Sequence, residues 1–327
     1  MHTEGVAHGP ATLFLHCGST NFIRPSLGSW VNYGLGSVNE NLPGYVVMLD
    51  SAGGPISGAK NWTSGYMPSA YQGTLFRSED PPILDLENAR GLSRAQQRTL
   101  LEGIQKFNAV HLSERADSSE LRSRIASYEL AYKMQAAAPE AIDVDSEPEY
   151  IKRLYGLDQD RTAEFARKFI LARRLVERGV RFVQLYHRGW DHHGNIKAAA
   201  AKTAKLVDQP AAALLKDLKQ RDMLKDTLVV WAGEFGRTPM AQGSGRDHHI
   251  KGFSIWMAGG GIKGGTSYGN TDELGYNAVE NVVTVHDVHA TMLRLLGIDH
   301  EQLTFPFQGR DFRLTDVAGN VIKPILA

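Results

Sequence analysis

Short apolar runs and longer amphipathic stretches alternate along most of this chain. Each of four runs is short, apolar and bounded by turn or helix signals, which predicts β-strands at Tyr45–Leu49, Arg181–Tyr186, Thr227–Ala232 and Phe253–Ala258. Helical periodicity lies between or after them, at about Arg161–Arg178, Ala198–Gln220 and His286–Leu296. This alternation predicts an α/β fold in which a mainly parallel central sheet, made of all four strands, carries helices on both faces.

Two further segments lie outside this alternation. The first 80 residues are rich in glycine, proline, asparagine and aromatic residues, which predicts mostly loop around one strand. Residues 93–138 have helical periodicity, because the apolar positions Leu121, Ile125, Tyr128, Leu130 and Met134 are spaced to line one face. We expect this segment to form a helical cover within a single domain that spans residues 1–327.

Composition narrows the classes of function. The chain has 327 residues, of which 42% are hydrophobic, so it can bury a full core. Lysine plus arginine equals aspartate plus glutamate at 36 each, so no overall charge attracts the chain to nucleic acid or to an anionic membrane. No run approaches the roughly 20 apolar residues that a membrane-spanning helix needs. We therefore expect neither a nucleic-acid partner nor a membrane span.

Polar clusters lie where the predicted strands begin or end, and ligands of open α/β sheets gather beyond the carboxyl ends of strands. Three loops carry carboxylates and imidazoles: Asp191 and His193 in the first, Glu234 in the second, and His248 in the third. Mixed oxygen and nitrogen ligands suit zinc, manganese or iron better than calcium. We predict that these four side chains converge on a divalent metal, zinc or manganese.

Each of these residues also has an ordinary structural role open to it. Aspartate and histidine beside glycine are common in surface turns, and Glu234 can form a structural ion pair with an arginine. Successive residues of an extended chain point to opposite faces, so only one of His248 and His249 should face the metal. We choose His248 as the ligand. For the pair in the first loop, we rank His192 below His193 as a metal ligand.

Arginines stand beside the predicted ligands in all three loops. Arg188, Arg237 and Arg246 could bind an anionic group of a substrate through paired hydrogen bonds, or could neutralise the carboxylates. The sequence does not separate these two roles.

Several motifs together resemble one family, the domain-of-unknown-function family 1501, whose members are sulfatase-like proteins of the alkaline phosphatase superfamily. The resemblance covers nearly the whole chain and is carried by Arg24–Trp30, Leu171–Val180, Trp190–His193, Gly233–Pro239, Gly245–His249 and Val285–Thr291.

The resemblance implies an alkaline phosphatase-like fold with a two-metal site at the carboxyl edge of its sheet. Asp191, His193 and His248 resemble the ligands of one metal, and Glu234 stands where the superfamily has an aspartate for the second. Phosphatases follow that aspartate with a histidine, but this chain has Phe235, which leaves the second metal short of a ligand.

The resemblance also bears on the start of the chain. Family members usually begin with a strand and a glycine-rich turn that carries an early aspartate, so the chain resembles an amino-terminally truncated member. The absent part would hold the first strand, one metal carboxylate and an export signal, which implies an exported, periplasmic or extracellular full-length protein. Thr3 and His8 lie nearest to the superfamily's nucleophile; neither is assigned that role, but His8 is a catalytic candidate.

The leading hypothesis is metal-dependent hydrolysis of a phosphate or sulfate ester of a small molecule or carbohydrate. Metal would neutralise the anionic oxygens, and Arg237 or Arg246 would hold the free oxygens as charge develops. Two alternatives remain: a non-catalytic sulfatase-like protein that binds anionic carbohydrate, and an inactive truncated fragment.

Overall fold

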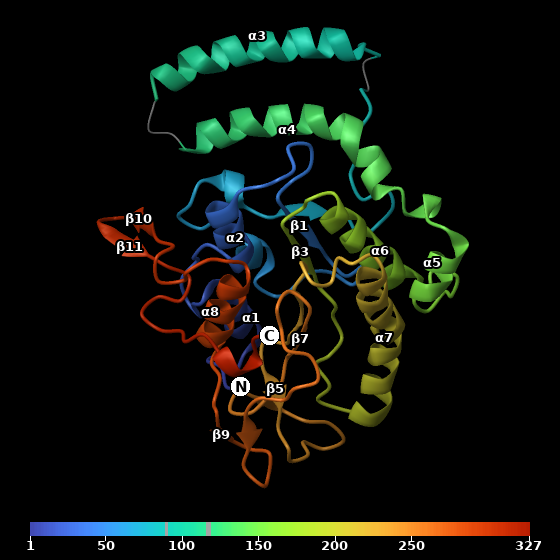
Figure 1. Ribbon diagram of the computed structural model, residues 1–327, viewed down its shortest axis with the longest axis vertical. Helices are drawn as coiled ribbons and strands as arrows, with labels where there is room; N and C mark the ends of the chain where they lie inside the picture. The colour runs from blue at the N-terminus through green and yellow to red at the C-terminus, as the bar shows by residue number, and fades with distance from the viewer. Residues whose placement is uncertain (89–90, 116–118) are drawn as a thin grey trace.

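A small parallel sheet lies at the centre of the structure (Figure 1), a computed structural model that describes residues 1–88, 91–115 and 119–327. Its strands are β1 (Tyr45–Met48), β2 (Thr74–Phe76) and β3 (Phe182–Leu185), in the order β2-β1-β3. Both strand pairs are parallel. β1 is fully buried because it pairs on both edges and carries apolar side chains on both faces.

Helices cover both faces of this sheet. On one face α6 (Ala163–Glu177) and α7 (Ile196–Gln220) share a hydrophobic cluster with β1. On the other face α2 (Leu27–Leu35) and α8 (Val285–Leu295) share a second cluster, against which Phe182 of β3 packs. The predicted mixed α/β arrangement, with helices on both faces of a parallel sheet, is therefore present.

The prediction that four strands form one sheet is wrong. β4 (Val229–Trp231) and β7 (Trp256–Ala258) form a separate antiparallel pair. Within the described residues no ladder joins β3 to β4, and β3 is partly exposed along its whole length. An apolar run indicates burial but does not say which strand edge it pairs with. Because the parallel sheet has three short strands, the structure establishes a mixed α/β arrangement and not the alkaline phosphatase-like fold.

The amino-terminal segment contains two helices where we expected mostly loop. α1 (His8–Cys17) ends at Gly18, whose left-handed φ of 66° closes the helix. α2 begins after Ser26, whose side chain accepts a hydrogen bond from the Ser29 backbone N–H. Gly18 is one of the glycines that suggested loop, but together with Ser26 it serves as a helix cap.

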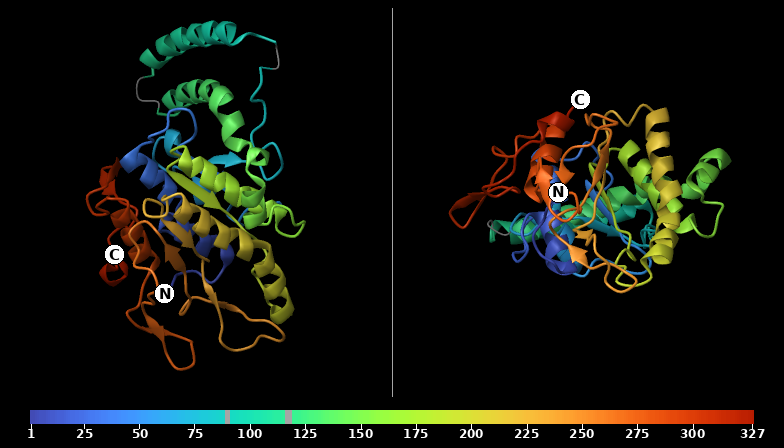
Figure 2. Two further views of the ribbon diagram at one scale, coloured as in Figure 1. Left: turned by 45° about the vertical axis from the view of Figure 1, so that its right-hand side comes forward. Right: turned by 90° about the horizontal axis from the view of Figure 1, so that it is seen from below.

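The predicted helical cover at residues 93–138 is a pair of helices, α3 (Arg94–Ser113) and α4 (Ser119–Ile142). The carboxyl-terminal part of α4 leads into the body, whereas α3 lies beyond α4 and projects from the upper end of the molecule (Figures 1 and 2). α3 has no fully buried residue. Most of the surface of α3 is therefore accessible to solvent.

The remaining α-helix and the remaining strands are short. They are α5 (Glu149–Tyr155), β5 (Gly236–Arg237), β6 (His248–His249), β8 (Asn270–Thr271), β9 (Ala278–Glu280), β10 (Phe305–Phe307) and β11 (Arg310–Phe312). Among the helices of the described residues, none combines the length and the apolar character needed to cross a membrane.

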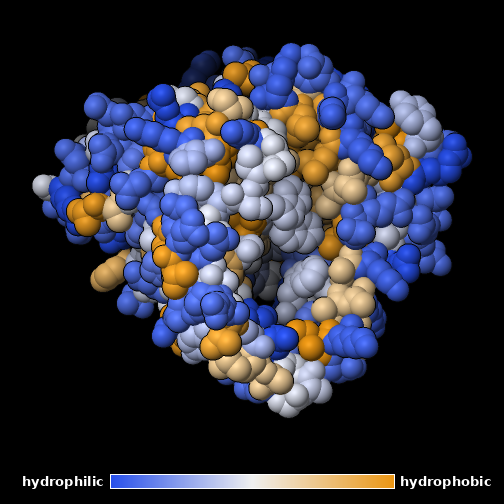
Figure 3. Space-filling view, turned by 60° about the horizontal axis from the view of Figure 1, so that its bottom comes forward, coloured by the Kyte–Doolittle hydropathy of each residue, from blue (hydrophilic) through white to orange (hydrophobic). Residues whose placement is uncertain are grey.

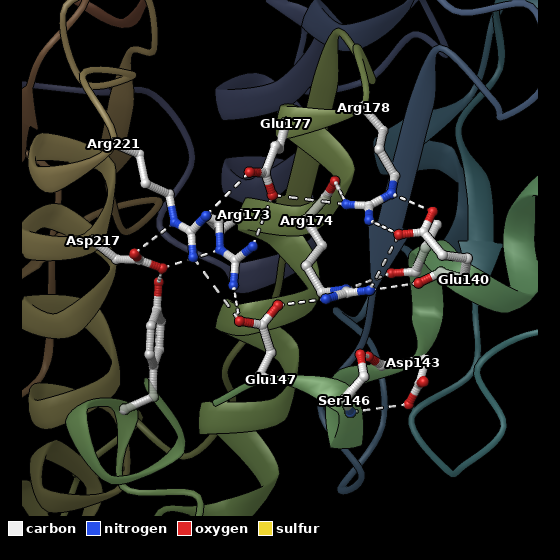
Figure 4. Close-up of polar contacts among 12 residues, drawn as sticks. Glu140, Asp143, Ser146, Glu147, Arg173, Arg174, Glu177, Arg178, Asp217 and Arg221 are labelled. Atoms are coloured by element: carbon white, nitrogen blue, oxygen red, sulfur yellow. Dashed lines mark hydrogen bonds and ion pairs between the residues drawn. The ribbon is translucent and has the colours of Figure 1, made fainter. Parts of the chain in front are cut away.

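A buried network of charges joins α6 to α7 and to the segment before α5 (Figure 4). The Arg173 side chain, only 1% exposed, lies 2.7 Å from a Glu147 carboxylate oxygen and 3.0 Å from one of Asp217. The angles of these two contacts fall outside hydrogen-bond geometry, so they are ion pairs. Arg174 also contacts Glu147 and donates to the Ala141 carbonyl at 3.0 Å. Each buried charge therefore has an opposite charge beside it.

Replacing Asp217 by alanine should lower the free energy of unfolding by about 3–5 kcal/mol, because Arg173 would keep a buried charge with one fewer partner. Urea denaturation would measure the change. Glu79→Ala is the control, since Glu79 forms an exposed pair with Arg77, and it should cost under about 1 kcal/mol. Equal losses for the two variants would contradict a structural role for the network.

The buried His289 and the partly buried His16 should make the fold sensitive to acid. Burial lowers the pKa of His16 to about 3 and that of His289 to about 4. Below about pH 6.5 the unfolded chain binds protons that these native imidazoles do not, so stability should fall as pH drops from 6.5 toward 4. Each imidazole contributes a slope of up to about 1.4 kcal/mol per pH unit.

Urea denaturation at a series of pH values would measure this slope. His16→Gln should flatten it, while His111→Gln, at an exposed position on α3, should leave it unchanged. If the free energy of unfolding did not change between about pH 7 and about pH 5, the range in which an ordinary imidazole titrates, these two imidazoles would be accepting protons without loss of stability.

Candidate functional site

Three segments far apart in the sequence bring possible metal ligands together. His8 is the first residue of α1, Asp191 lies in the loop after β3, and His248 lies in β6. One ligand atom from each of these three residues lies within 4.8 Å of the other two. β6 pairs with β5 so that His248 stands opposite Arg237, which brings that arginine to the same place.

The Asp191 carboxylate is the centre of this cluster. Its Oδ1 atom lies 2.6 Å from Nη2 of Arg237, 3.0 Å from Nε2 of His193 and 3.2 Å from Nε2 of His248. Its Oδ2 atom lies 3.2 Å from Nε2 of His8. Burial alone would raise the pKa of Asp191, but the hydrogen bond from Arg237 and the positive charge of its guanidinium hold that pKa well below its ordinary value. Asp191 is therefore a carboxylate at neutral pH.

Hydrogen bonds on the far side of two imidazoles fix which nitrogen faces Asp191. Nδ1 of His248 lies 2.6 Å from the Val6 carbonyl oxygen, which can only accept, so this nitrogen carries the proton. Nδ1 of His8 lies 2.6 Å from a Glu234 carboxylate oxygen, which accepts in the same way. The neutral tautomer of each ring then presents an Nε2 lone pair to Asp191. Histidines that bind metals in proteins usually have their second nitrogen held like this.

A third imidazole completes the arrangement. Nδ1 of His193 lies 2.8 Å from the Gln242 side-chain oxygen, and its Nε2 lies 3.1 Å from Nε2 of His248. Two nitrogens that both present lone pairs at this distance need a proton or a cation between them. Nε2 of His8 is buried and makes no hydrogen bond in spite of its approach to Asp191. Nitrogen donors around one carboxylate therefore fit the ligand preferences of zinc or manganese.

Two neighbouring residues shape the cluster without being ligands. The ring of Phe235 stacks on His248 at 4.4 Å and lies 5.0 Å from His8, so it limits how both imidazoles can turn. Gly245 passes His193 so closely that an added Cβ would lie 2.1 Å from a backbone atom of His193. Only glycine allows this approach.

The structure separates the arginines that the sequence left equivalent. Arg237 contacts Asp191, as described above. Arg246 instead donates from Nη1 to the Thr238 carbonyl at 2.7 Å and to the Pro239 carbonyl, and Arg188 donates to the Ala52 carbonyl at 2.9 Å. Arg246 and Arg188 thus hold loops, while Arg237 lies at the site.

The neighbouring histidines also separate. His249 is buried and its Nε2 donates to the Tyr276 carbonyl at 2.5 Å, so it points away from His248. His192 is buried beside Thr203 of α7. Glu234 contacts the cluster through His8 and is not among the three residues whose ligand atoms converge.

Sequence reasoning placed His8 among the catalytic candidates but not among the ligands. We expected the ligands at the ends of strands, whereas His8 begins a helix in a segment that we expected to be mostly loop. The available signal was the mainly apolar segment from Ala11 to Leu15 with Gly18 shortly after it. Gly18 is a typical helix end, so the pattern favours a helix that begins near His8.

The lower end of the molecule, where β5 lies in Figure 1, is hollowed near its middle and is mostly hydrophilic at its rim (Figure 3). A separate cavity of 520 Å³ lies between the Ser78–Asp80 turn, α5 and α6. It shares no residue with the His8, Asp191 and His248 cluster. We assign the candidate site from the donor atoms rather than from the size of a cavity.

Comparison with known proteins gives one match. A family described as "Protein of unknown function (DUF1501)" matches residues 1–326. No curated protein and no solved structure matches the chain. Because the match spans nearly all of the 327 residues, the chain belongs to the DUF1501 family.

Proposed function

We propose that this protein is a metal-dependent hydrolase of phosphate or sulfate esters. The observation that carries the proposal is the convergence of His8, Asp191 and His248, with His193 beside them. Their donor atoms face one point, and the second nitrogen of each imidazole is already held by an acceptor. A site organised in this way needs little rearrangement to bind a cation.

Each residue near the cation has a separate role. His8, Asp191 and His248 would bind zinc or manganese, and His193 offers a further nitrogen from the more exposed side. Glu234 accepts the Nδ1–H of His8 and so keeps its Nε2 directed at the metal. A divalent metal in this place supplies positive charge against the ester oxygens and lowers the pKa of a water molecule.

Arg237 is the residue best placed to bind the substrate. One of its nitrogens contacts Asp191 at 2.6 Å, and its partly exposed guanidinium has further N–H donors. A guanidinium can pair with two oxygens of a phosphate or sulfate group. A bound divalent metal and Arg237 would together add positive charge beside the carboxylates of Asp191 and Glu234, which favours an anionic substrate. The resemblance of the motifs to sulfatase-like proteins of the alkaline phosphatase superfamily supports the same substrates, including esters of carbohydrates.

A metal-binding protein without turnover is the second candidate. Phe235 favours it, because this ring packs beside His8 and His248 in the position where the resembling phosphatases have a second-metal ligand. Such a protein would bind an anionic carbohydrate and release it unchanged.

Replacing His248 by alanine should lower the affinity for zinc more than about 100-fold, because a ligand bond is lost outright. Glu234→Gln should lower it about 10- to 100-fold, since Glu234 acts through His8. His249→Ala is the matched control and should leave the affinity unchanged, because His249 points away. Metal content after dialysis against a zinc buffer would rank the zinc affinities of the three variants, and circular dichroism would verify that each is folded. Equal losses at His248 and His249 would show that the assignment of the two faces is wrong.

Hydrolysis of 4-nitrophenyl phosphate and 4-nitrophenyl sulfate in the presence of zinc or manganese tests the reaction itself. Arg237→Ala should lower kcat/KM about 10²- to 10³-fold, because a donor to the developing charge is removed. Arg181→Ala is the control, since the Arg181 side chain donates to the Gly36 carbonyl and lies away from the site. A folded, metal-loaded protein that binds both esters but hydrolyses neither would favour the second candidate.

A further inference from the structure

An exposed apolar stripe lies along α3. Leu100 is 51% exposed, Phe107 is 81% exposed and Val110 is 62% exposed. At 3.6 residues per turn these side chains fall within about 80° of one another, and Gly103 falls between them. The other side of α3 packs on α4, where Arg98 pairs with Glu129 at 2.8 Å. We call Leu100, Gly103, Phe107 and Val110 the α3 stripe.

The presence of glycine at position 103 is a second, independent observation that concerns this stripe. Gly103 lies in the interior of a 20-residue helix, where glycine is less favourable than alanine. A Cβ added to Gly103 would meet nothing within 4 Å, so packing within this chain does not require a glycine. A glycine without a local reason on an exposed helix face allows another helix to approach closely.

We propose that α3 of a second copy of this chain covers the α3 stripe in an antiparallel arrangement, with the two Gly103 residues near the crossing point. Leu100 and Phe107 lie at equal distances along the sequence from a point between Gly103 and Ile104. A two-fold axis through that point sets Leu100 of each copy against Phe107 of the other. The stripe is therefore self-complementary, as a symmetric dimer interface must be.

Charge along the edge of the stripe supports the same occupant. Lys106 and Glu102 lie on one flank of the stripe, where Glu102 also pairs with Arg98 at 3.1 Å, and the same flanks face each other in an antiparallel pair. Lys106 of each copy then lies near Glu102 of the other, which makes two opposite-charge contacts. α3 is the outermost element at its end of the molecule (Figures 1 and 2), so a second copy can reach it without meeting the body.

Sedimentation equilibrium of the full chain tests the proposal. The wild-type protein should form a dimer of twice its 36.0 kDa mass. Phe107→Glu should raise the dimer dissociation constant at least about 30-fold, because it places a charge at the centre of the interface. Phe22→Glu is the matched control, because Phe22 is also an exposed phenylalanine, at 68%, and it should leave the constant unchanged.

Gly103→Gln separates a lost interface from a lost fold. Glutamine is the better helix former, so the monomer should melt no lower than the wild type, yet its side chain should block the close approach and weaken the dimer. If this variant dimerised as strongly as the wild type, the two α3 helices would not cross near Gly103.

Disulfide trapping tests the direction of the pair. A mixture of Gln96→Cys and His111→Cys proteins should form cross-linked heterodimers in the antiparallel arrangement, and the buried Cys17 should not compete. Preferred cross-linking of Gln96→Cys to itself would indicate a parallel pair and overturn the arrangement.

A wild-type protein that remains monomeric at every concentration would overturn the proposal. So would a monomer that co-sediments with phosphatidylcholine and phosphatidylserine vesicles through Phe107, because the stripe would then bind lipid. Neither result depends on metal binding or on hydrolysis, so the dimer and the proposed function are tested separately.

Discussion

One accessible carboxylate, that of Asp191, is the point where segments from three parts of the chain meet. Asp191 is ionised, and its two oxygens draw a guanidinium and three imidazoles from the start of α1, the loop after β3, and the β5-β6 pair. These contacts join three segments that lie far apart in the sequence at one charged group. The contacts between α1 and the β5-β6 pair are therefore the same contacts that form the candidate metal site.

Two clusters of arginine and carboxylate serve different purposes in this structure. Around Arg173 every charge is enclosed, and the Glu147 and Asp217 side chains are nearly inaccessible to solvent. Around Asp191 the carboxylate side chain is 45% exposed and imidazoles replace most of the cations. The first cluster can only hold helices together, whereas the second can exchange partners with an ion or a substrate. Accessibility and ligand type, rather than charge alone, distinguish the candidate site.

Small strands leave the position of the site to loops. β5 and β6 have two residues each, yet their pairing sets Arg237 opposite His248. The close passage of Gly245 and the stacked ring of Phe235 then restrict the histidines. Loops with functional residues are usually positioned by a rigid scaffold. Here hydrogen bonds to carbonyl and carboxylate oxygens also fix the positions of the side chains.

The sequence by itself determined the local structure and the chemical inventory. Apolar runs located β1, β3, β4 and β7 to within a few residues, and periodicity located α6, α7 and α8, because both patterns report on burial near each residue. The motifs also identified the residue types that converge, including His248 in preference to His249.

Only the tertiary structure decided which edges and which atoms meet. β4 pairs with β7 and not with β3, since strand pairing depends on distant backbone groups that no local pattern encodes. Glu234 holds His8, and Arg246 holds backbone carbonyls, although both stand in motifs that resemble a metal site. The direction of a long side chain is set by the partners that folding brings within hydrogen-bond distance, and those partners lie tens or hundreds of residues away in the sequence.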